Sequence, residues 1–181
     1  MSHDRKTRPF ALAIVGASGT GKTTLIERLV PEMTGHGLKV GTVKHDAHEF
    51  EIDRPGKDSY RHKAAGASTA VITCDKKLAL VTDLDAPAPI ERVIGWFFTD
   101  CDIVVVEGYH LSSLPKIWVR RKGIPDDHIQ ATSILATLTY DIDGAESGVA
   151  SRVVEELADL ILQAMVSGSE SQVAPGRVFR G

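Results

Sequence analysis

The feature that most constrains this chain is a glycine-rich segment that lies between an apolar run and a helical pattern. The apolar run FALAIV covers residues 10–15, and apolar residues recur at spacings of three and four from residue 22 to Gly35. Between them, residues 16–23 read GASGTGKT and match the pattern GxxxxGK[ST] at every constrained position. A strand, a glycine-rich turn and a helix in this order predict a loop that cradles phosphates.

This segment predicts a site for a nucleoside triphosphate and its magnesium ion. Glycines allow the loop to turn its N–H groups inward, and the N-terminus of the following helix adds partial positive charge. Lys22 is expected to reach the β- and γ-phosphates, and Thr23 to place its hydroxyl on magnesium, a cation that prefers oxygen ligands. The predicted phosphate-binding residues are Gly16, Ala17, Ser18, Gly19, Thr20, Gly21, Lys22, Thr23 and Thr24.

A second apolar run, residues 103–106, is flanked by two acids, Asp102 before it and Glu107 after it. In a parallel sheet, ligands lie beyond the carboxyl ends of the strands. Five residues at about 3.3 Å each put Asp102 roughly 16 Å from that end. Glu107 is therefore the predicted magnesium-site acid and, with Lys22, a predicted catalytic residue, whereas Asp102 is expected to begin the strand.

The whole pattern predicts an α/β fold of the P-loop NTPase type, with a largely parallel sheet flanked by helices. The expected strands are 10–15, 39–44, 68–73, 78–82, 103–107, 116–121 and 134–139, and the expected helices are 22–35, 58–65, 89–98 and 149–165. Residues 1–8 and 167–181 are expected to be flexible tails around one nucleotide-binding domain at 9–166. The apolar segment Leu114–Val119 is expected to be an edge strand, which must be covered or paired, for instance in a homodimer.

Composition argues against several classes of partner. The formal net charge of −3 gives no basic excess for nucleic acid or an anionic membrane surface. No apolar run is long enough for a membrane span or a signal-peptide core. Cys74 and Cys101 lie far apart, so neither a disulfide framework nor a zinc site is expected, and a reducing cytoplasm is the expected location.

The segment 44–67, KHDAHEFEIDRPGKDSYRHKAAGA, is dense in charged and histidine side chains. The spacing of His45 and His48 would allow both to ligate a metal, but no third ligand is fixed, and hydrogen-bonded loop histidines are the simpler alternative. Two interpretations are open for four further charged residues: they form a solvated face, or they form a switch that responds to phosphate. These residues are Asp53, Lys57, Asp58 and Arg61. Because they follow the second strand, we expect them at the same sheet edge as the glycine-rich loop, which favours the switch.

Four segments together resemble the molybdopterin-guanine dinucleotide biosynthesis protein B family, which are small P-loop GTP-binding proteins. They are GASGTGKTTL at 16–25, the polar segment at 44–67, DIVVVEGYH at 102–110 and PKIWVRR at 115–121. The polar segment is the most specific of these, because the glycine-rich loop alone is shared by many families. His110 departs from the family, which usually has Lys after the Glu-Gly-aromatic triplet.

The resemblance implies a weakly hydrolysing GTP-binding homodimer with bound Mg²⁺. Its partners would be a molybdenum cofactor guanylyltransferase, which joins GMP to molybdopterin, and the molybdopterin-bearing enzymes of the pathway. The segment from His45 to Arg61 would sense nucleotide or hold the pterin cofactor. No NKxD motif occurs in the sequence, so the preference for guanine is implied by the resemblance alone.

Two other functions fit the same glycine-rich loop. A small-molecule kinase would use the segment 45–61 as an acceptor site, and a metallochaperone GTPase would use His45, His48 and His110 as ligands. For an adapter, hydrolysis is expected to be slow, because the sequence offers no obvious arginine finger or water-orienting glutamine.

Overall fold

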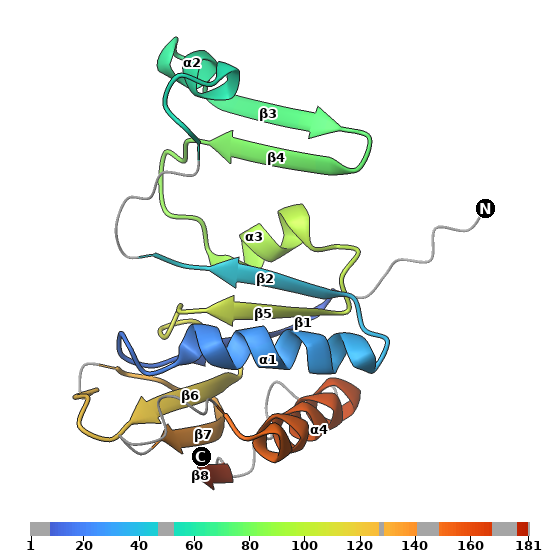
Figure 1. The fold of residues 1–181 in the computed structure, drawn as a ribbon, viewed down its shortest axis with the longest axis vertical. Coiled ribbons are helices and arrows are strands. Elements are labelled where there is room, and N and C mark those ends of the chain that lie inside the picture. Colours follow the sequence, from blue (N-terminus) through green and yellow to red (C-terminus); the bar gives the residue numbers. More distant parts are fainter. Residues whose placement is uncertain (1–7, 47–52, 127–128, 141–148, 168–176, 181) are drawn as a thin grey trace. The chain divides into compact units, whose positions relative to one another are not determined.

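The chain forms two compact units. In a computed structural model, the described residues are 8–46, 53–126, 129–140, 149–167 and 177–180. The first unit comprises Met1–His45 and Ile90–Gly181, and the second comprises Asp46–Pro89 (Figure 1). The sequence predicts a single domain at 9–166, and the structure instead separates residues 46–89 from the rest of that range.

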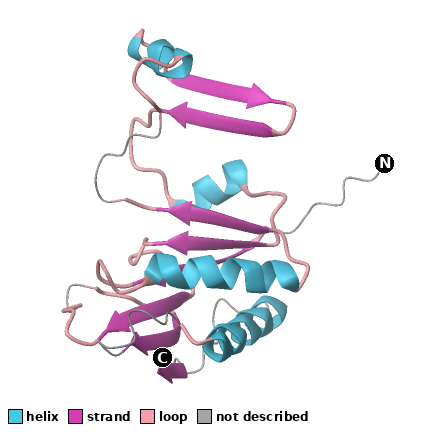
Figure 2. Ribbon diagram, viewed as in Figure 1, coloured by secondary structure: helices cyan, strands magenta, loops and turns pink. Residues whose placement is uncertain are grey.

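The first unit is built on a six-stranded sheet in which each described pair of neighbouring strands is parallel. The strand order is β2-β5-β1-β6-β7-β8 (Figure 2). In chain order these strands are β1 (Phe10–Val15), β2 (Val40–Lys44), β5 (Ile103–Glu107), β6 (Lys116–Arg121), β7 (Ile134–Tyr140) and β8 (Arg177–Arg180). The predicted α/β fold with a largely parallel sheet is confirmed.

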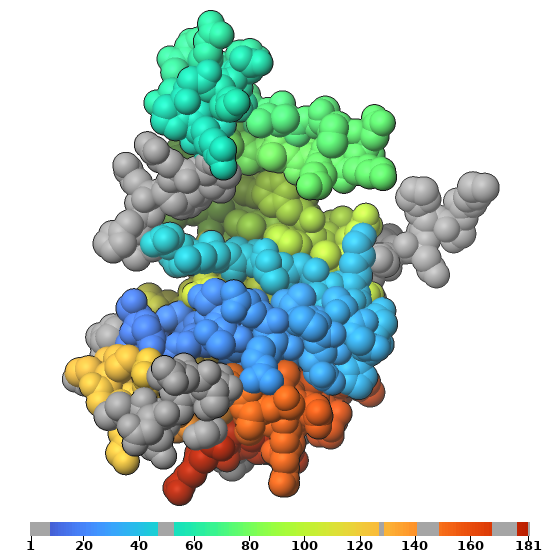
Figure 3. All heavy atoms as spheres, viewed as in Figure 1, coloured from blue at the N-terminus to red at the C-terminus, as the bar shows by residue number. Residues whose placement is uncertain are grey.

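Helices cover both faces of this sheet. They are α1 (Lys22–Gly35), α3 (Ile90–Phe97) and α4 (Ser151–Ser167). On one face, α1 and α4 lie side by side (Figure 3). Leu29 of α1, Leu157 of α4 and Ile117 of β6 belong to the same buried hydrophobic cluster. On the other face, Ile94 of α3 packs against Val104 of β5. Within the described ranges, no helix is long and apolar enough to cross a membrane.

The second unit is a two-stranded antiparallel hairpin with a short helix before it. Its elements are α2 (Asp58–Ala64), β3 (Thr69–Cys74) and β4 (Lys77–Thr82). Lys63, in the last turn of α2, joins the helix to the base of the hairpin. Its ammonium donates to the carbonyls of Ala67 and Ser68 at 2.7 and 2.9 Å and lies 2.6 Å from the Asp83 carboxylate. Because these contacts link residues of the same segment, they help to make it a unit of its own.

A buried lysine fixes the connection between β5 and β6. Lys116 is fully buried, and its ammonium donates to the carbonyls of Ser112 at 2.5 Å and Leu114 at 2.9 Å. Burial lowers the pKa of Lys116, since the charged form loses its hydration. The short chain between the carboxyl end of β5 and the start of β6 is therefore held in one path.

Two predictions about the limits of the sheet are wrong. Residues 177–180, which were expected in a flexible tail, form β8, which pairs with β7 and buries Phe179 in the core beneath α1 and α4. The segment Leu114–Val119, which was expected at an edge, overlaps β6, and β6 pairs with β1 on one side and β7 on the other. Ile117 and Val119 are apolar because helices cover the sheet there, so they give no reason for dimerisation.

We expect Phe179→Ala to lower the free energy of unfolding by about 3 kcal/mol, because it empties a buried aromatic site. Val178→Ala is the matched control, since Val178 neighbours Phe179 on β8 but is 66% exposed, and it should stay within about 0.5 kcal/mol of the unaltered chain. Urea denaturation followed by circular dichroism measures both. Equal, small effects of the two substitutions would mean that β8 is not part of the folded sheet.

Candidate nucleotide-binding site

The glycine-rich loop connects the carboxyl end of β1 to the first residue of α1. Gly19 and Gly21 have φ angles of 75° and 94°, a region in which a side chain is strained. Gly21 directly precedes the helix and offers no side chain to cap it. The first-turn N–H groups of a helix have no partner within the helix, so they are free to meet an anion at this end of α1.

Gly16 lies where the loop passes closest to β6. A Cβ atom at this position would collide with the carbonyl oxygen of Val119 and lie 2.9 Å from the hydroxyl of Thr20. That hydroxyl, which is buried, donates to the carbonyl of Ala17 at 2.9 Å. Glycine is therefore required at the first position of the loop for a steric reason. The buried hydrogen bond of Thr20 stabilises the turn.

Lys22 folds its side chain back over the loop. Its ammonium donates to the carbonyls of Gly16 at 3.0 Å and Ala17 at 2.8 Å. Burial lowers the pKa of Lys22 and the positive charge of Lys44 lowers it further, while the negative charge of Glu107 acts in the opposite direction. The loop thus holds a partly desolvated cation beside an acid, which suits a group that must meet phosphate charge.

Thr23 and Glu107 lie next to each other. The Thr23 hydroxyl is 3.1 Å from one carboxylate oxygen of Glu107 and 3.2 Å from the other. Glu107 ends β5, where it pairs in register with Ile14 of β1 and Lys44 of β2, so it stands at the same sheet edge as the loop. A hydroxyl and a carboxylate that meet at one point form an oxygen donor set of the kind that magnesium prefers.

Asp102 lies at the other end of the same strand, as predicted. Its carboxylate accepts from the backbone N–H of Lys39 at 2.7 Å, and its own N–H donates to the Lys39 carbonyl at 2.8 Å. Asp102 therefore joins the amino ends of β2 and β5 and stands away from the loop. The structure separates the two acids by position along the strand, and only Glu107 meets Thr23.

His45, the residue after β2, lies against the chain that follows Glu107. Its N–H donates to the Glu107 carbonyl at 3.0 Å, and its ring stacks on that of Tyr109 with centroids 4.2 Å apart and planes at 33°. Gly108 and Tyr109 have positive φ angles of 96° and 53°, which turn the chain sharply. Sequence reasoning singled out His45 but missed Tyr109. The signal that could have identified Tyr109 is its position directly after the Glu-Gly pair at the end of a strand.

The other predicted residues are divided between the two units. Ser18 and Thr24 are exposed, Ser18 in the loop and Thr24 in the first turn of α1. The four charged residues of the polar segment belong to the second unit: Asp53, Lys57, Asp58 and Arg61. Their place beside the phosphate loop stays a prediction. His48 lies outside the described residues, within which no group of three or more His, Cys, Asp or Glu could hold a metal.

Two residues that sequence reasoning missed also contact the loop. Arg121, at the end of β6, donates to the Gly19 carbonyl at 3.4 Å. Tyr140, at the end of β7, places its ring 3.6 Å from where a Cβ of Gly21 would lie. Burial raises the pKa of Tyr140 to about 12, and its hydroxyl has no hydrogen-bond partner among the described residues. β6 neighbours β1, and β7 is the next strand beyond β6, an order that only the structure reveals.

A parallel sheet whose central strand leads through a GxxxxGK[ST] loop into a helix defines the P-loop NTPase class, and this chain has that fold. The family model for molybdopterin guanine dinucleotide synthesis protein B matches residues 11–140. The chain belongs to this family, and the resemblance seen in the sequence is confirmed.

Relatives and solved structures agree with this assignment. A molybdopterin-guanine dinucleotide biosynthesis adapter protein from Haemophilus influenzae is 34% identical over 137 residues, which is 73% of this chain and 77% of that protein. The adapter protein of the same name from Escherichia coli is 31% identical over 175 residues, which is 88% of this chain and 95% of that protein. A crystal structure of molybdopterin-guanine biosynthesis protein B aligns with a TM-score of 0.65 and 28% identity, over 87% of this chain and 99% of the other.

We expect Gly16→Ala to lower the free energy of unfolding by roughly 1–3 kcal/mol, because the added methyl group meets the Val119 carbonyl, which is backbone and has little room to shift. Gly35→Ala is the matched control: it ends α1 with open space around it and should be neutral or stabilising. Chemical denaturation compares the two. Equal stability of both variants would contradict the close approach of the loop to β6.

Proposed function

We propose that this chain is an adapter in molybdopterin guanine dinucleotide synthesis that binds GTP with Mg²⁺ and hydrolyses it slowly. The observation that carries this proposal is the contact of the Thr23 hydroxyl with the Glu107 carboxylate beside the Lys22 ammonium. The names of the relatives from Haemophilus influenzae and Escherichia coli support the adapter role. Guanine is preferred in this proposal because of the family, and no residue of the chain is assigned to read the base.

Each residue of the site has a distinct task in this proposal. The loop N–H groups and the start of α1 hold the phosphates, as expected for residues Gly16 to Thr24. Lys22 leaves the Gly16 and Ala17 carbonyls and places its charge on the phosphates. Thr23 and Glu107 supply hard oxygen donors, which fit Mg²⁺. The bound ion would neutralise phosphate charge.

The arrangement of the arginine that contacts the loop supports slow hydrolysis. Phosphoryl transfer is catalysed mainly by positioning and by neutralising charge on the transferred group. Arg121, the arginine that contacts the loop, is directed at the Gly19 carbonyl. We propose that a partner protein or a second copy of the chain supplies the group that completes the site.

The partners in this proposal are a molybdenum cofactor guanylyltransferase and the molybdopterin-bearing enzymes of the pathway, all in the cytoplasm. Asp58 and Arg61 would serve the pterin-nucleotide chemistry and not the binding of triphosphate. Their place in the second unit supports this division of tasks, because the phosphate loop lies wholly in the first unit.

We also propose a homodimer, and the observation that supports it is not the segment Leu114–Val119 but the hairpin of the second unit. The hairpin of the second unit exposes large apolar side chains: Val71 is 50% exposed, Ile72 53% and Leu78 69%. A two-stranded hairpin is rarely stable in water without a covering partner. A second copy of the chain would bury these residues, and a monomeric mass by light scattering at micromolar concentration would contradict this.

We expect the unaltered chain to bind a fluorescent GTP analogue at least tenfold more tightly than its ATP counterpart, and Lys22→Ala to lose this binding without unfolding. Lys39→Ala, which removes an exposed lysine at the amino end of the sheet, is the matched control and should bind normally.

Glu107→Gln should reduce the dependence of binding on Mg²⁺, whereas Asp102→Asn should not. Equal affinity for both nucleotides would remove the guanine assignment, and transfer of the γ-phosphate to a small acceptor would indicate a kinase.

The adapter role predicts that the chain stimulates GMP transfer to molybdopterin by a purified guanylyltransferase. Asp58→Ala and Arg61→Ala should keep GTP affinity within about tenfold, or roughly 1.4 kcal/mol, yet reduce this stimulation. Arg54→Ala, an exposed arginine of the same segment, is the control. Full stimulation by both variants would mean that Asp58 and Arg61 are only solvated surface residues. No stimulation by the unaltered chain would contradict the adapter role.

A further inference from the structure

Tyr140 carries a buried polar atom that the phosphate-binding residues do not use. The residue ends β7, and its side chain packs against the hydrophobic cluster beneath α1 and α4. Its hydroxyl oxygen is shielded from solvent and has no hydrogen-bond partner among the described residues. Buried hydroxyls without a partner are uncommon, because they lose their hydration and gain no hydrogen bond in exchange. The Tyr140 hydroxyl is therefore a candidate contact for a ligand.

The ring of Tyr140 lies beside the phosphate loop. Its Cε2 atom is 3.6 Å from the position that a Cβ atom of Gly21 would occupy, and Gly21 directly precedes α1. The end of β7 is held there, because the backbone N–H of Lys122 donates to the Tyr140 carbonyl at 2.9 Å. The hydroxyl is attached to the ring carbon next to Cε2, so it stands close to the amino end of α1.

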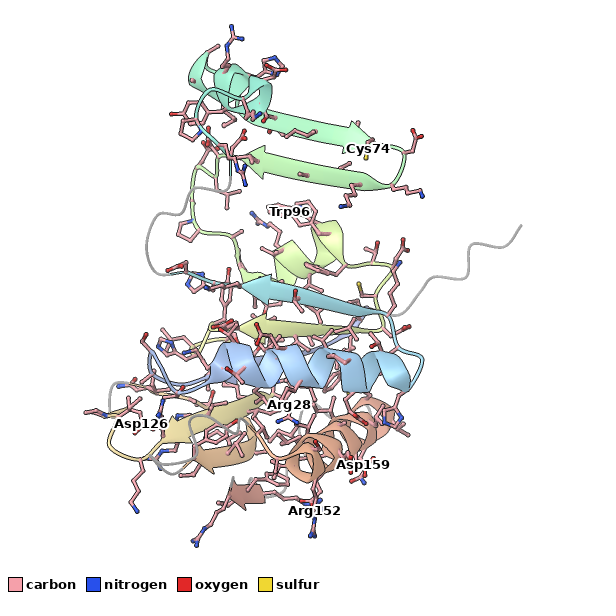
Figure 4. All side chains as sticks on the ribbon, viewed as in Figure 1. Arg28, Cys74, Trp96, Asp126, Arg152 and Asp159 are labelled. Atoms are coloured by element: carbon pink, nitrogen blue, oxygen red, sulfur yellow. The ribbon has the colours of Figure 1, made fainter. Side chains whose placement is uncertain are left out.

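The Tyr140 hydroxyl keeps its proton at physiological pH. Burial raises the pKa of Tyr140 to about 12, and the positive charge of Arg28 acts in the opposite direction. Arg28 is engaged elsewhere: its guanidinium donates to the Ser151 hydroxyl at 3.0 Å, at the start of α4 (Figure 4). The phenol is therefore neutral, and it offers a hydrogen bond to an acceptor oxygen and does not act as a base.

The strand order indicates which part of a nucleoside triphosphate lies near Tyr140. In the proposed function, Thr23 and Glu107 hold Mg²⁺, which bridges the β- and γ-phosphates. Glu107 ends β5 on one side of β1, whereas β6 and β7 lie on the other side. The γ-phosphate is therefore directed toward β5, and the α-phosphate and the nucleoside are directed toward β7. The ribose is joined to the α-phosphate, so it is the part of the nucleoside nearest to the loop.

We propose that Tyr140 contacts the ribose of the bound nucleotide, its hydroxyl donating a hydrogen bond to a ribose oxygen. This inference rests on the proposed triphosphate site. Because the oxygen is shielded in the free chain, the ring turns toward the loop when the nucleotide binds. The hydroxyl is unpaired in the free chain and paired in the complex, so the contact favours binding and contributes nothing to folding.

Tyr140→Phe tests the hydroxyl alone, because the ring is kept. In titration calorimetry with Mg²⁺, we expect this variant to bind both GTP and ATP about fivefold more weakly, the change expected for one neutral hydrogen bond. Inorganic tripolyphosphate has no ribose and should bind as it does to the unaltered chain. In urea without ligand, the unfolding midpoint should be unchanged or higher, because the lost hydroxyl had no partner. A purely structural role would not weaken the nucleotides alone.

Two further variants serve as controls. Thr139→Val removes a hydroxyl from the neighbouring residue of β7, which faces the other side of the sheet, and it should bind all three ligands normally. Lys22→Ala should lose all three ligands, which locates their binding in the phosphate loop.

Four results with Tyr140→Phe would overturn the proposal. They are unchanged affinity for GTP and ATP, an equal loss for tripolyphosphate, a loss for GTP alone, which would place the contact on the base, and a lowered urea midpoint. Failure of the proposed function is visible separately in the unaltered chain. Equal affinity for GTP and ATP would remove only the guanine preference, whereas no binding of any of the three ligands would overturn both proposals.

Discussion

The structure depends on the pairing of β1 with a parallel strand on each side. This register sets Ile14 beside Glu107 and Val15 beside Trp118, so the phosphate loop leaves the sheet between the ends of β5 and β6. From there Gly16 comes against the Val119 carbonyl, and Thr23 meets Glu107. A slip of one residue would turn every β1 side chain to the other face and separate these partners. The geometry of the site is therefore a consequence of strand pairing as much as of the loop sequence.

Much of this was predictable where the local pattern was strong. The strands 10–15, 103–107 and 116–121 and the helix 22–35 have the bounds that their apolar runs and flanking glycines predict. Four-residue β8 was not predicted, because RVFR sits in a segment rich in glycine, serine and proline and is ordered by its pairing with β7. The contacts of Arg121 and Tyr140 with the loop depend on which strands are neighbours, and sequence spacing does not contain that information.

The local distribution of charge is a second feature that the composition of the chain could not predict. A net charge of −3 indicated no general attraction for polyanions, yet several cations meet where β6, β7 and β8 end. Arg120, Arg121 and Lys122 are consecutive, and the parallel sheet brings Arg180 from a distant part of the sequence to the same edge, because β6 and β8 both end there. A whole-chain average cannot reveal a local field of this kind, which acts over roughly the 8–10 Å of a Debye length.

The hydrogen bond from the His45 N–H to the Glu107 carbonyl has a practical consequence. His45 is the last residue of the first unit before the chain enters the second, and its partner belongs to the acid that meets Thr23. The backbone amide of this one residue is thus a natural spectroscopic reporter. In a chain labelled uniformly with nitrogen-15, its exchange rate with deuterated solvent and its nitrogen chemical shift would register any displacement of β5 at the phosphate edge, without an attached probe or a substitution in the site itself.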